Sequence, residues 1–469
     1  MYELDEIKQR PFIFIRDRRI LLVIGFLLVL LILGAGWYFF TPKVISVYPP
    51  NDQSDTLSAS TIQITFNQEM NTTILNDLLL IEPAVSGSYT WVDRSLVFTP
   101  DAPWPADTKI SYRLSPQVKS SLGLPVINGA SWRFSIKHAW LVYLINHNGK
   151  SELYRLDPTG EETIKLIDAP STILDYQSHL DGRHILYAML QGRDTEIRLA
   201  DLETKSDSLL YTCPKTYCYQ VALSKDLLNL AFVMGAIPET GVKSNSSTWL
   251  LALNELQPQG DPIRVAAEDH ITRDISWSPS GWLAFYDDTS KGFTFFHPSD
   301  GESKNLPNDT GEAGSWSPTN DVYYFSEILF NDSVDPTAPQ YYSRLSSYSL
   351  DTGQTQVVLT NDQSEDVAPI VSSDGNLIAF GRRFLNSKDW TPGRQLWTIR
   401  IDGSDPRSLT DDPMSTQMGF SWSPDSSQIA YTSFNTASLT SDRELWIADV
   451  KTGFTRKLLV DAYNLQWLD

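Results

Sequence analysis

One short motif recurs through the C-terminal two thirds of this 469-residue chain and constrains its fold more than any other feature. Its two clearest copies are Ser276-Trp277-Ser278-Pro279 and Ser421-Trp422-Ser423-Pro424, each followed by turn residues and a short apolar run. A self-similar unit of roughly 40 to 55 residues, built from short strands and turns, is typical of β-propellers. One such unit cannot bury its apolar faces alone, so the units must pack against one another.

The repeat can be counted along the sequence. Opening strands with their turns are predicted at 173–182, 219–226, 275–281, 314–319, 369–375 and 420–426. The last residues, 464–469, imitate this opening, and we expect them to pair with the strand at 141–145, which has no opening strand of its own. Such pairing removes an exposed sheet edge. We therefore predict a propeller of seven blades over 139–469, closed by the C-terminal strand, with six or eight blades as alternatives.

The tryptophans of the motif, Trp277, Trp316 and Trp422, are predicted to supply large contacts between blades, while its proline and glycine form a tight turn. The Trp-Ser-Pro pattern followed by Ile-Ala-Phe resembles the PD40 or WD40-like repeat of TolB-like propellers and of the propeller domains attached to prolyl oligopeptidases. The openings at 173–182 and 219–226 depart from the motif. The resemblance covers about 330 residues and implies the fold rather than a function.

The segment 44–137, which precedes the repeat, alternates apolar and polar residues. Strands are predicted at 44–48, 61–66, 95–100, 109–114 and 131–136. About 90 residues with strands at this spacing predict a β-sandwich, so the predicted fold class is all-β. The segment resembles the bacterial Ig-like family of the SbsA or Big_5 type, through Ser46-Val47-Tyr48-Pro49-Pro50 and Trp132-Arg133-Phe134 among other residues. That resemblance implies a spacer or adhesive module without chemistry of its own.

Residues 20–40 form a run without a charged side chain. A helix of that length spans a hydrocarbon core of about 30 Å. Basic residues precede the run, so the positive-inside rule places 1–19 in the cytoplasm and the bulk of the chain outside. We therefore expect a single-pass transmembrane helix and a cell-membrane location, with a cleaved signal peptide as the alternative.

Net charge limits the partners that this chain can bind, and cysteine content limits its redox and metal chemistry. The net charge of −20 makes nucleic acid a poor partner, because an acidic surface repels phosphate. The only two cysteines, Cys213 and Cys218, are predicted to form a small-loop disulfide, which we favour over a redox or zinc site.

The sequence offers little catalytic chemistry. It contains no Gly-x-Ser-x-Gly nucleophile motif, and its six histidines are scattered. The acidic pairs Asp287-Asp288 and Asp411-Asp412 suit Ca²⁺, but no complete calcium-binding loop is present. We therefore predict no catalytic residue, no cofactor and no metal site, with Ca²⁺ as a weaker alternative.

Long loops mark one face of the predicted propeller. The segments 235–248, 327–345, 382–395 and 433–444 all connect second to third strands, and the connections between blades open on the same face. Loops longer than about 12 residues in a compact fold are usually functional or disordered. The candidate partner-binding residues on this face combine aromatic anchors with an acidic mouth: Tyr341, Tyr342, Phe330, Trp390, Asp269, Asp309, Asp366 and Asp412.

These observations favour a membrane-anchored, non-enzymatic binding or scaffold protein outside the cytoplasm. Its propeller is predicted to recognise a protein or glycan of the cell envelope. One alternative is a propeller enzyme, a polysaccharide lyase or hydrolase with a metal at the channel mouth. Another is a purely structural envelope component. An enzyme would need convergent ligands in the channel, whereas a structural component would lack a small-molecule pocket.

Overall fold

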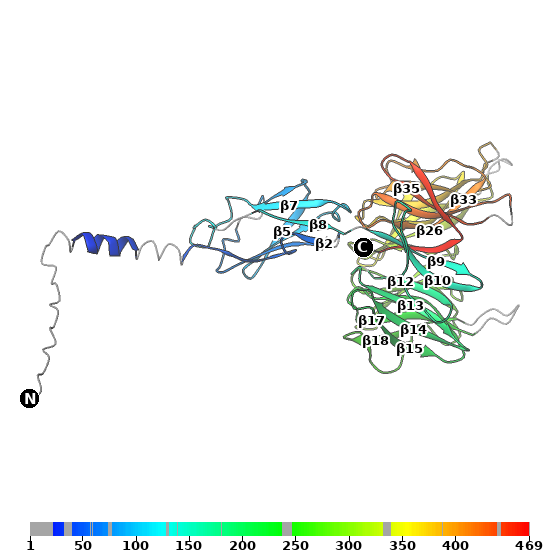
Figure 1. Cartoon of the computed structure of the whole chain (residues 1–469). Helices are drawn as coiled ribbons and strands as arrows, with labels where there is room; N and C mark the ends of the chain where they lie inside the picture. The colour runs from blue at the N-terminus through cyan, green and yellow to red at the C-terminus, as the bar shows by residue number, and fades with distance from the viewer. Residues whose placement is uncertain are drawn as a thin grey trace, which may run out of the picture. The chain divides into compact units, whose positions relative to one another are not determined.

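The computed structural model describes the following residues: 22–31, 40–56, 58, 60–73, 77–127, 131–137, 139–179, 181–236, 246–331, 339–386, 388–438 and 442–468. Two compact units are present, one holding most residues up to Phe134 and the other holding Ser135–Asp469. Apart from a short helical segment near the N-terminus, the regular structure of these described residues consists of strands (Figure 1).

The prediction of a transmembrane helix at 20–40 is wrong. Residues 22–31 are helical, but ten residues at 1.5 Å per residue cover about 15 Å, half of a hydrocarbon core. Among the described residues, no helix combines the length and the apolar character needed to cross a bilayer. The remainder of the span, 20–21 and 32–39, and the predicted cytoplasmic tail, 1–19, lie outside the described residues. The predictions of a single-pass anchor and of the cell-membrane location derived from it are therefore also wrong.

The segment 44–136 folds into two four-stranded antiparallel sheets, with strand orders β1-β3-β6-β5 and β2-β8-β7-β4. Burial alternates along β3, where Ile62, Ile64 and Phe66 are buried and the residues between them are half-buried. This is the period-two pattern of a strand with one face on a core. The strands are β1 (Val44–Tyr48), β2 (Gln53–Thr56), β3 (Ile62–Phe66), β4 (Leu79–Glu82), β5 (Gly87–Val92), β6 (Ser95–Pro100), β7 (Lys109–Leu114) and β8 (Ser131–Ile136).

The described residues from Trp140 onward form seven sheets, each a meander whose first strand is the innermost. Blade 1 contains β37 (Ala462–Leu468), β9 (Trp140–His147), β10 (Lys150–Leu156) and β11 (Thr163–Lys165). Blade 2 contains β12 (Ile173–Ser178), β13 (His184–Gln191), β14 (Asp194–Asp201) and β15 (Ser206–Cys213). Blade 3 contains β16 (Tyr217–Leu223), β17 (Asn229–Gly235), β18 (Ser247–Asn254), β19 (Gln257–Pro258) and β20 (Ile263–Arg264).

The other four blades follow the same order of strands. Blade 4 contains β21 (Thr272–Trp277), β22 (Leu283–Asp287), β23 (Gly292–Phe296) and β24 (Ser303–Pro307). Blade 5 contains β25 (Ser315–Trp316), β26 (Val322–Phe330), β27 (Tyr341–Ser349) and β28 (Gln354–Leu359). Blade 6 contains β29 (Ser364–Val371), β30 (Leu377–Phe384), β31 (Gln395–Arg400) and β32 (Arg407–Ser408). Blade 7 contains β33 (Ser415–Trp422), β34 (Gln428–Asn435), β35 (Glu444–Asp449) and β36 (Thr455–Val460).

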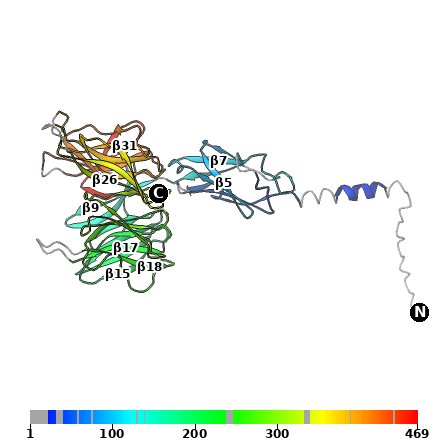
Figure 2. The same ribbon diagram turned by 180° about the vertical axis from the view of Figure 1, so that it is seen from behind.

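The C-terminal strand closes the ring, as the sequence predicts. β37 pairs antiparallel with β9, with Trp467 opposite Leu141 and Ala462 opposite Ile145. Figures 1 and 2 show the red C-terminal strand beside the cyan β9 from opposite sides. The first blade is therefore built from both ends of the propeller sequence, and its edge is covered.

The tryptophans of the opening motif tie consecutive blades together through their indole N–H groups. Each indole donates to a backbone carbonyl in the preceding blade, one residue before the position that corresponds to the tryptophan. The donor and acceptor pairs are Trp277 with Ala222 (3.0 Å), Trp316 with Ser276 (3.4 Å), Trp422 with Ile370 (2.9 Å) and Trp467 with Ser421 (3.0 Å). The repeat therefore encodes contacts between blades as well as contacts within them.

The serine of the motif organises the tight turn that follows each opening strand. In blade 7 the Ser423 hydroxyl accepts a hydrogen bond from Gln428 N at 2.9 Å and donates to Asp425 at 2.7 Å. In blade 4 the hydroxyl of Ser278 accepts from Trp282 N at 3.0 Å, and Gly281 has a φ of 97° that favours glycine. Serine and glycine thus serve the turn directly.

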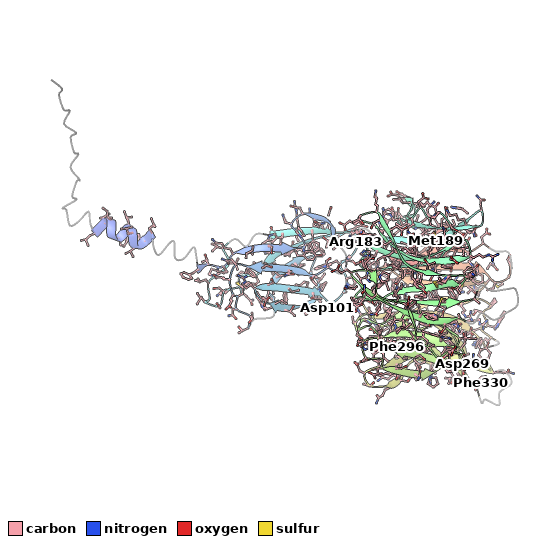
Figure 3. All side chains as sticks on the ribbon, turned by 90° about the horizontal axis from the view of Figure 1, so that it is seen from below. Asp101, Arg183, Met189, Asp269, Phe296 and Phe330 are labelled. Atoms are coloured by element: carbon pink, nitrogen blue, oxygen red, sulfur yellow. A yellow bond between two sulfur atoms is a disulfide. The ribbon has the colours of Figure 1, made fainter. Side chains whose placement is uncertain are left out.

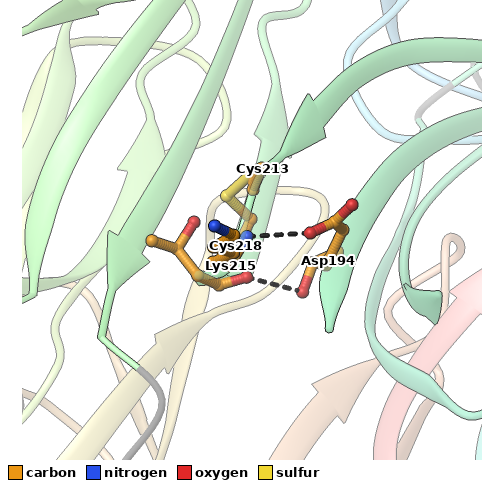
Figure 4. Close-up of a disulfide and its surroundings, with 6 residues drawn as sticks. Asp194, Cys213, Lys215 and Cys218 are labelled. Atoms are coloured by element: carbon orange, nitrogen blue, oxygen red, sulfur yellow. Dashed lines mark hydrogen bonds between the residues drawn. A yellow bond between two sulfur atoms is a disulfide. The ribbon is translucent and has the colours of Figure 1, made fainter. Parts of the chain in front are cut away.

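A disulfide joins Cys213, at the end of β15, to Cys218 in β16, as predicted (Figure 4). Both cysteines are fully buried, and the Asp194 carboxylate accepts a hydrogen bond from Lys215 N at 2.9 Å within the same connection. The disulfide therefore cross-links the last strand of blade 2 to the first strand of blade 3 across a short connection.

Replacing both cysteines by alanine is expected to lower the free energy of unfolding by about 2 kcal/mol. The cross-link restricts the unfolded chain, so the oxidised chain loses less conformational entropy on folding than the variant does. Urea unfolding of the oxidised chain and of the double variant measures this difference. The oxidised chain treated with a thiol reductant serves as the control and should lose a similar amount. Equal midpoints for all three samples would contradict a structural role.

Candidate functional site

One face of the propeller, which we call the loop face, is formed by the connections between second and third strands and by those between blades. Hydrogen bonds join the two kinds of connection: Gly393 N donates to the Pro413 carbonyl at 2.9 Å, and Thr436 Oγ1 donates to that of Met414 at 2.7 Å. Asp269, which lies between two blades, lies near the end of the propeller that carries Phe330 (Figure 3). The two kinds of connection are therefore in direct contact where blades 6 and 7 meet.

The predicted aromatic residues of the loop face are largely exposed. Phe330 at the end of β26 is 80% exposed and lies opposite Tyr341 in β27, which is 39% exposed. Tyr342 is half-buried opposite Leu329. Trp390, in the connection between β30 and β31, is 60% exposed. Large aromatic side chains at these exposures are typical of binding surfaces.

The predicted loops are described only in part. The segments 237–245, 332–338, 387 and 439–441, which belong to the four long loops, lie outside the described residues. The β26–β27 pairing nevertheless extends from Val322 to Phe330, so this loop begins from a regular ladder. Phe330 and Tyr341 are therefore held by backbone pairing at the last described rungs.

The predicted acidic residues fall into two groups. Asp269, Asp309 and Asp412 are exposed, and Asp412 accepts hydrogen bonds from Met414 N at 3.0 Å and Ser415 Oγ at 2.6 Å. This last arrangement is a turn that the aspartate itself stabilises. Of these residues, Asp412 thus has a local structural role in addition to its exposure.

Asp366 does not belong to an exposed mouth, and its prediction as a surface residue is wrong. It lies within β29 directly opposite Arg382 of β30, and both side chains are buried. Arg382 Nε and Nη2 donate to the two carboxylate oxygens at 2.7 Å each, and the guanidinium lies 4.7 Å from the ring centre of Trp397. Because Arg382 lies directly opposite Asp366 in the ladder, its two hydrogen bonds hold the carboxylate in the protein interior.

Arginine also neutralises other carboxylates near the loop face. Glu365 binds both Arg383 and Arg394 at 2.9 Å, and Glu327 binds Arg344 at 2.7 Å. Paired charges contribute little to the long-range field of a surface. The loop face is therefore less acidic than the amino-acid composition implies.

The central channel carries a second candidate site that the sequence analysis did not identify. The residue three positions before the motif tryptophan, or before Ser178, Leu223 and Val371 that take its place in blades 2, 3 and 6, lies on or just before an inner strand, at a bulge in most blades. At this position blades 1 to 4 carry polar residues and blades 5 to 7 carry small ones, in the order Asn464, Asp175, Gln220, Asp274, Ala313, Ala368 and Gly419. The sequence feature that could have revealed this site is the division between polar and small residues at this one position of the repeat.

Hydrogen bonds connect the polar half of this ring from blade to blade. The Asp175 carboxylate accepts from Asn464 Nδ2 at 2.8 Å and from Val221 N at 3.1 Å. Gln220 Nε2 donates to Asp274 at 2.9 Å, and its amide oxygen accepts from Asp274 N at 2.7 Å. The network joins four neighbouring blades along the channel wall.

Desolvation by the surrounding protein raises the pKa of Asp175 to about 6, although hydrogen bonds from Val221 N and Asn464 oppose the shift. A raised pKa in the folded state means that the ionised carboxylate destabilises the fold relative to the protonated acid. The associated stability is therefore complete below the unfolded pKa near 4 and is lost as the pH rises through about 6.

Asp175→Asn should remove this pH dependence. We expect the stability of the native chain relative to the variant to fall by on the order of 3 kcal/mol between pH 4 and pH 7. Urea unfolding at half-unit pH steps measures the difference in free energy of unfolding between the two chains. Other titrating groups are common to both chains, so their contributions cancel in this difference. Asp226→Asn, on a tight turn, is the control and should track the native chain. Parallel pH profiles for native and Asp175→Asn would contradict the assignment.

The histidines of the described residues pair with carboxylates rather than gathering into a cluster. No cluster of three or more histidine, cysteine, aspartate or glutamate side chains that suits a metal occurs among the described residues. His270 Nδ1 lies 2.5 Å from Asp287 and its Nε2 lies 3.9 Å from Asp269, whereas His184 Nδ1 lies 2.6 Å from Asp181. His138 lies outside the described residues. Such pairs orient a side chain without forming a nucleophile.

Comparison with known proteins supports the assignment of the first domain. Residues 41–136 match the family model of the bacterial Ig-like domain. The predicted Ig-like resemblance is thereby confirmed for this segment. No curated protein sequence matches the chain.

The chain is also similar to solved propeller structures at low identity. TolB from Acinetobacter baumannii is 14% identical, with 83% of each chain covered and a TM-score of 0.43. An oligogalacturonate lyase from Vibrio parahaemolyticus is 18% identical, covering 56% of this chain and 71% of its own, with a TM-score of 0.39. A prolyl endopeptidase structure is 11% identical, covering 77% and 49%, with a TM-score of 0.49.

Proposed function

We propose that this chain is a non-catalytic binding protein whose propeller recognises a protein or glycan partner through the loop face. The main observation behind this proposal is the exposure of two aromatic side chains, Phe330 at 80% and Trp390 at 60%. Exposing such large apolar surface to water costs free energy, and binding a partner recovers it.

The framework beneath these aromatics supports the proposal. Phe330 extends from the β26–β27 ladder, and the Glu327–Arg344 ion pair of 2.7 Å braces the same ladder three residues earlier. The Trp390 connection begins at β30, whose Arg382 is held by Asp366. A rigid base lowers the entropy lost when an aromatic residue binds a partner.

The test is crosslinking of the tagged full-length chain in intact cells, followed by identification of the captured partner. Phe330→Ala/Trp390→Ala should reduce capture of that partner by about tenfold or more, as expected for hot-spot aromatics. Leu228→Ala/Phe454→Ala is the matched control, because these exposed apolar residues lie on tight turns away from the loop face. Equal capture by both double variants, or no specific partner, would overturn the proposal.

A further inference from the structure

A cavity of about 540 Å³ lies in the channel and is separate from the loop-face aromatics. Its wall comes from the inner strands β12, β16 and β21, from residues in and beside β25, and from Gln466 of β37, and it extends to the tight turns at Pro279 and Pro318. This volume lies within the range of small-molecule sites. The cavity is therefore large enough to hold a ligand rather than isolated water molecules.

The wall carries hydrogen-bonding groups whose capacity is incompletely used. The hydroxyl oxygen of Ser178 is buried and, within the part of the chain that the structure describes, has no hydrogen-bond partner. Leaving a buried hydroxyl unpaired costs free energy, and a ligand in the cavity would relieve that cost. The carboxamides of Gln177, Gln220 and Gln466 line the same cavity. Those of Gln220 and Gln466 already use the oxygen and one N–H in hydrogen bonds within the wall, so each keeps a second N–H for a ligand.

The charges of the wall are close to balance. Asp274 is paired with Arg273, whose guanidinium also binds Asp288 at 2.9 Å. Asp175 and Lys225 contribute one further carboxylate and one ammonium to the wall. These three carboxylates and two cations leave a small net charge, which offers a strongly charged ligand little gain to offset its desolvation. The wall suits a neutral ligand with many hydroxyl or amide groups.

Apolar surface lies beside these polar groups. Trp277 is half-buried, and together with Pro279 and Pro318 it forms part of the cavity wall. A sugar ring has apolar C–H faces and hydroxyl edges, so it matches a wall that combines an indole with amides and hydroxyls. We infer that this cavity is a binding site for a neutral, hydroxyl-rich ligand such as a short oligosaccharide.

Calorimetric titration of the full chain tests this site with defined probes. Maltotriose, cellotriose and triacetylchitotriose are the neutral probes, whereas trigalacturonate and trilysine are charged probes of similar length. At least one neutral probe should bind with a Kd below about 1 mM, and the charged probes should bind about tenfold more weakly or not at all. Preferential binding of a charged probe, or no binding of any neutral probe, would overturn the inference.

Two variants locate the bound probe. Ala313 is exposed and lines the cavity, so Ala313→Phe should fill the channel and weaken binding about tenfold or more. Ser178→Ala removes the unpaired hydroxyl and should also weaken binding. Ser206→Ala on the outer strand β15 is the control and should bind as the native chain does. Binding that neither cavity variant changes would place the probe elsewhere and refute the site. Loop-face variants should leave it intact, so the two proposals fail independently.

Discussion

Deleting residues 462–469 is expected to abolish cooperative unfolding of the propeller, although the deletion removes fewer than ten residues. β37 supplies the inner strand of blade 1, and its Leu465 and Leu468 are buried. Gln466 Oε1 accepts from Ser178 N at 2.7 Å, and Trp467 Nε1 donates to the Ser421 carbonyl at 3.0 Å. Burial and hydrogen bonding together contribute on the order of 8 kcal/mol, which is comparable to the whole stability of a typical protein.

Thermal unfolding followed by near-ultraviolet circular dichroism measures the effect of this deletion. A peptide of sequence 460–469 added in excess is the control, because it should restore the cooperative transition if the missing strand is the cause. Trp467→Phe keeps the strand and loses one hydrogen bond, so it should cost only about 1 kcal/mol. A truncated chain that unfolds cooperatively near the native midpoint would contradict the role of β37 in closure.

The second large effect is expected at the buried ion pair of Asp366 and Arg382. Arg382→Met leaves the Asp366 carboxylate buried without its bidentate partner, since Arg382 supplies two hydrogen bonds of 2.7 Å. Removing one member of a buried pair typically costs 3 to 5 kcal/mol, and we expect a loss of about this size. Replacing both residues, as Arg382→Met/Asp366→Leu, should recover much of it, because no buried charge then remains.

Urea unfolding of the single and double variants forms a thermodynamic cycle. Arg394→Met is the matched control: Arg394 binds Glu365 at 2.9 Å but is 31% exposed, so its loss should cost about 1 kcal/mol or less. The interpretation fails if Arg382→Met and Arg394→Met destabilise the chain equally. It also fails if the double variant is no more stable than the single one.

The repeat allowed much of the propeller to be predicted, because its motif encodes contacts that the sequence shows directly. Trp422 and Trp467 occupy the same position of the repeat and make the same indole bond to a preceding blade. Cys213 and Cys218 are near enough in sequence to predict their pairing without knowledge of the fold.

Other features depend on contacts that sequence spacing does not show. Asp366 was predicted in a connection between blades, at the acidic mouth of the loop face, but the strand β29 begins at Ser364 and includes it. The apolar run at 20–40 satisfied a length rule, whereas the described helix within it is too short to span a bilayer. The channel cavity was missed because its wall draws residues from five blades, whose contributing segments are about 40 or more residues apart in sequence.

The pairing of β37 with β9 also constrains how the chain is made. Tyr463 donates a hydrogen bond to Ser151 at 2.6 Å across 312 residues, so blade 1 stays incomplete until the residues of β37 have left the ribosome. At about 5 to 20 residues per second, the edge of β9 waits on the order of tens of seconds after its synthesis. Non-local strand pairing of this kind is intrinsically slow, and an uncovered edge is prone to aggregation. Termination of translation just before Ala462 would therefore release chains in which the edge of β9 is uncovered.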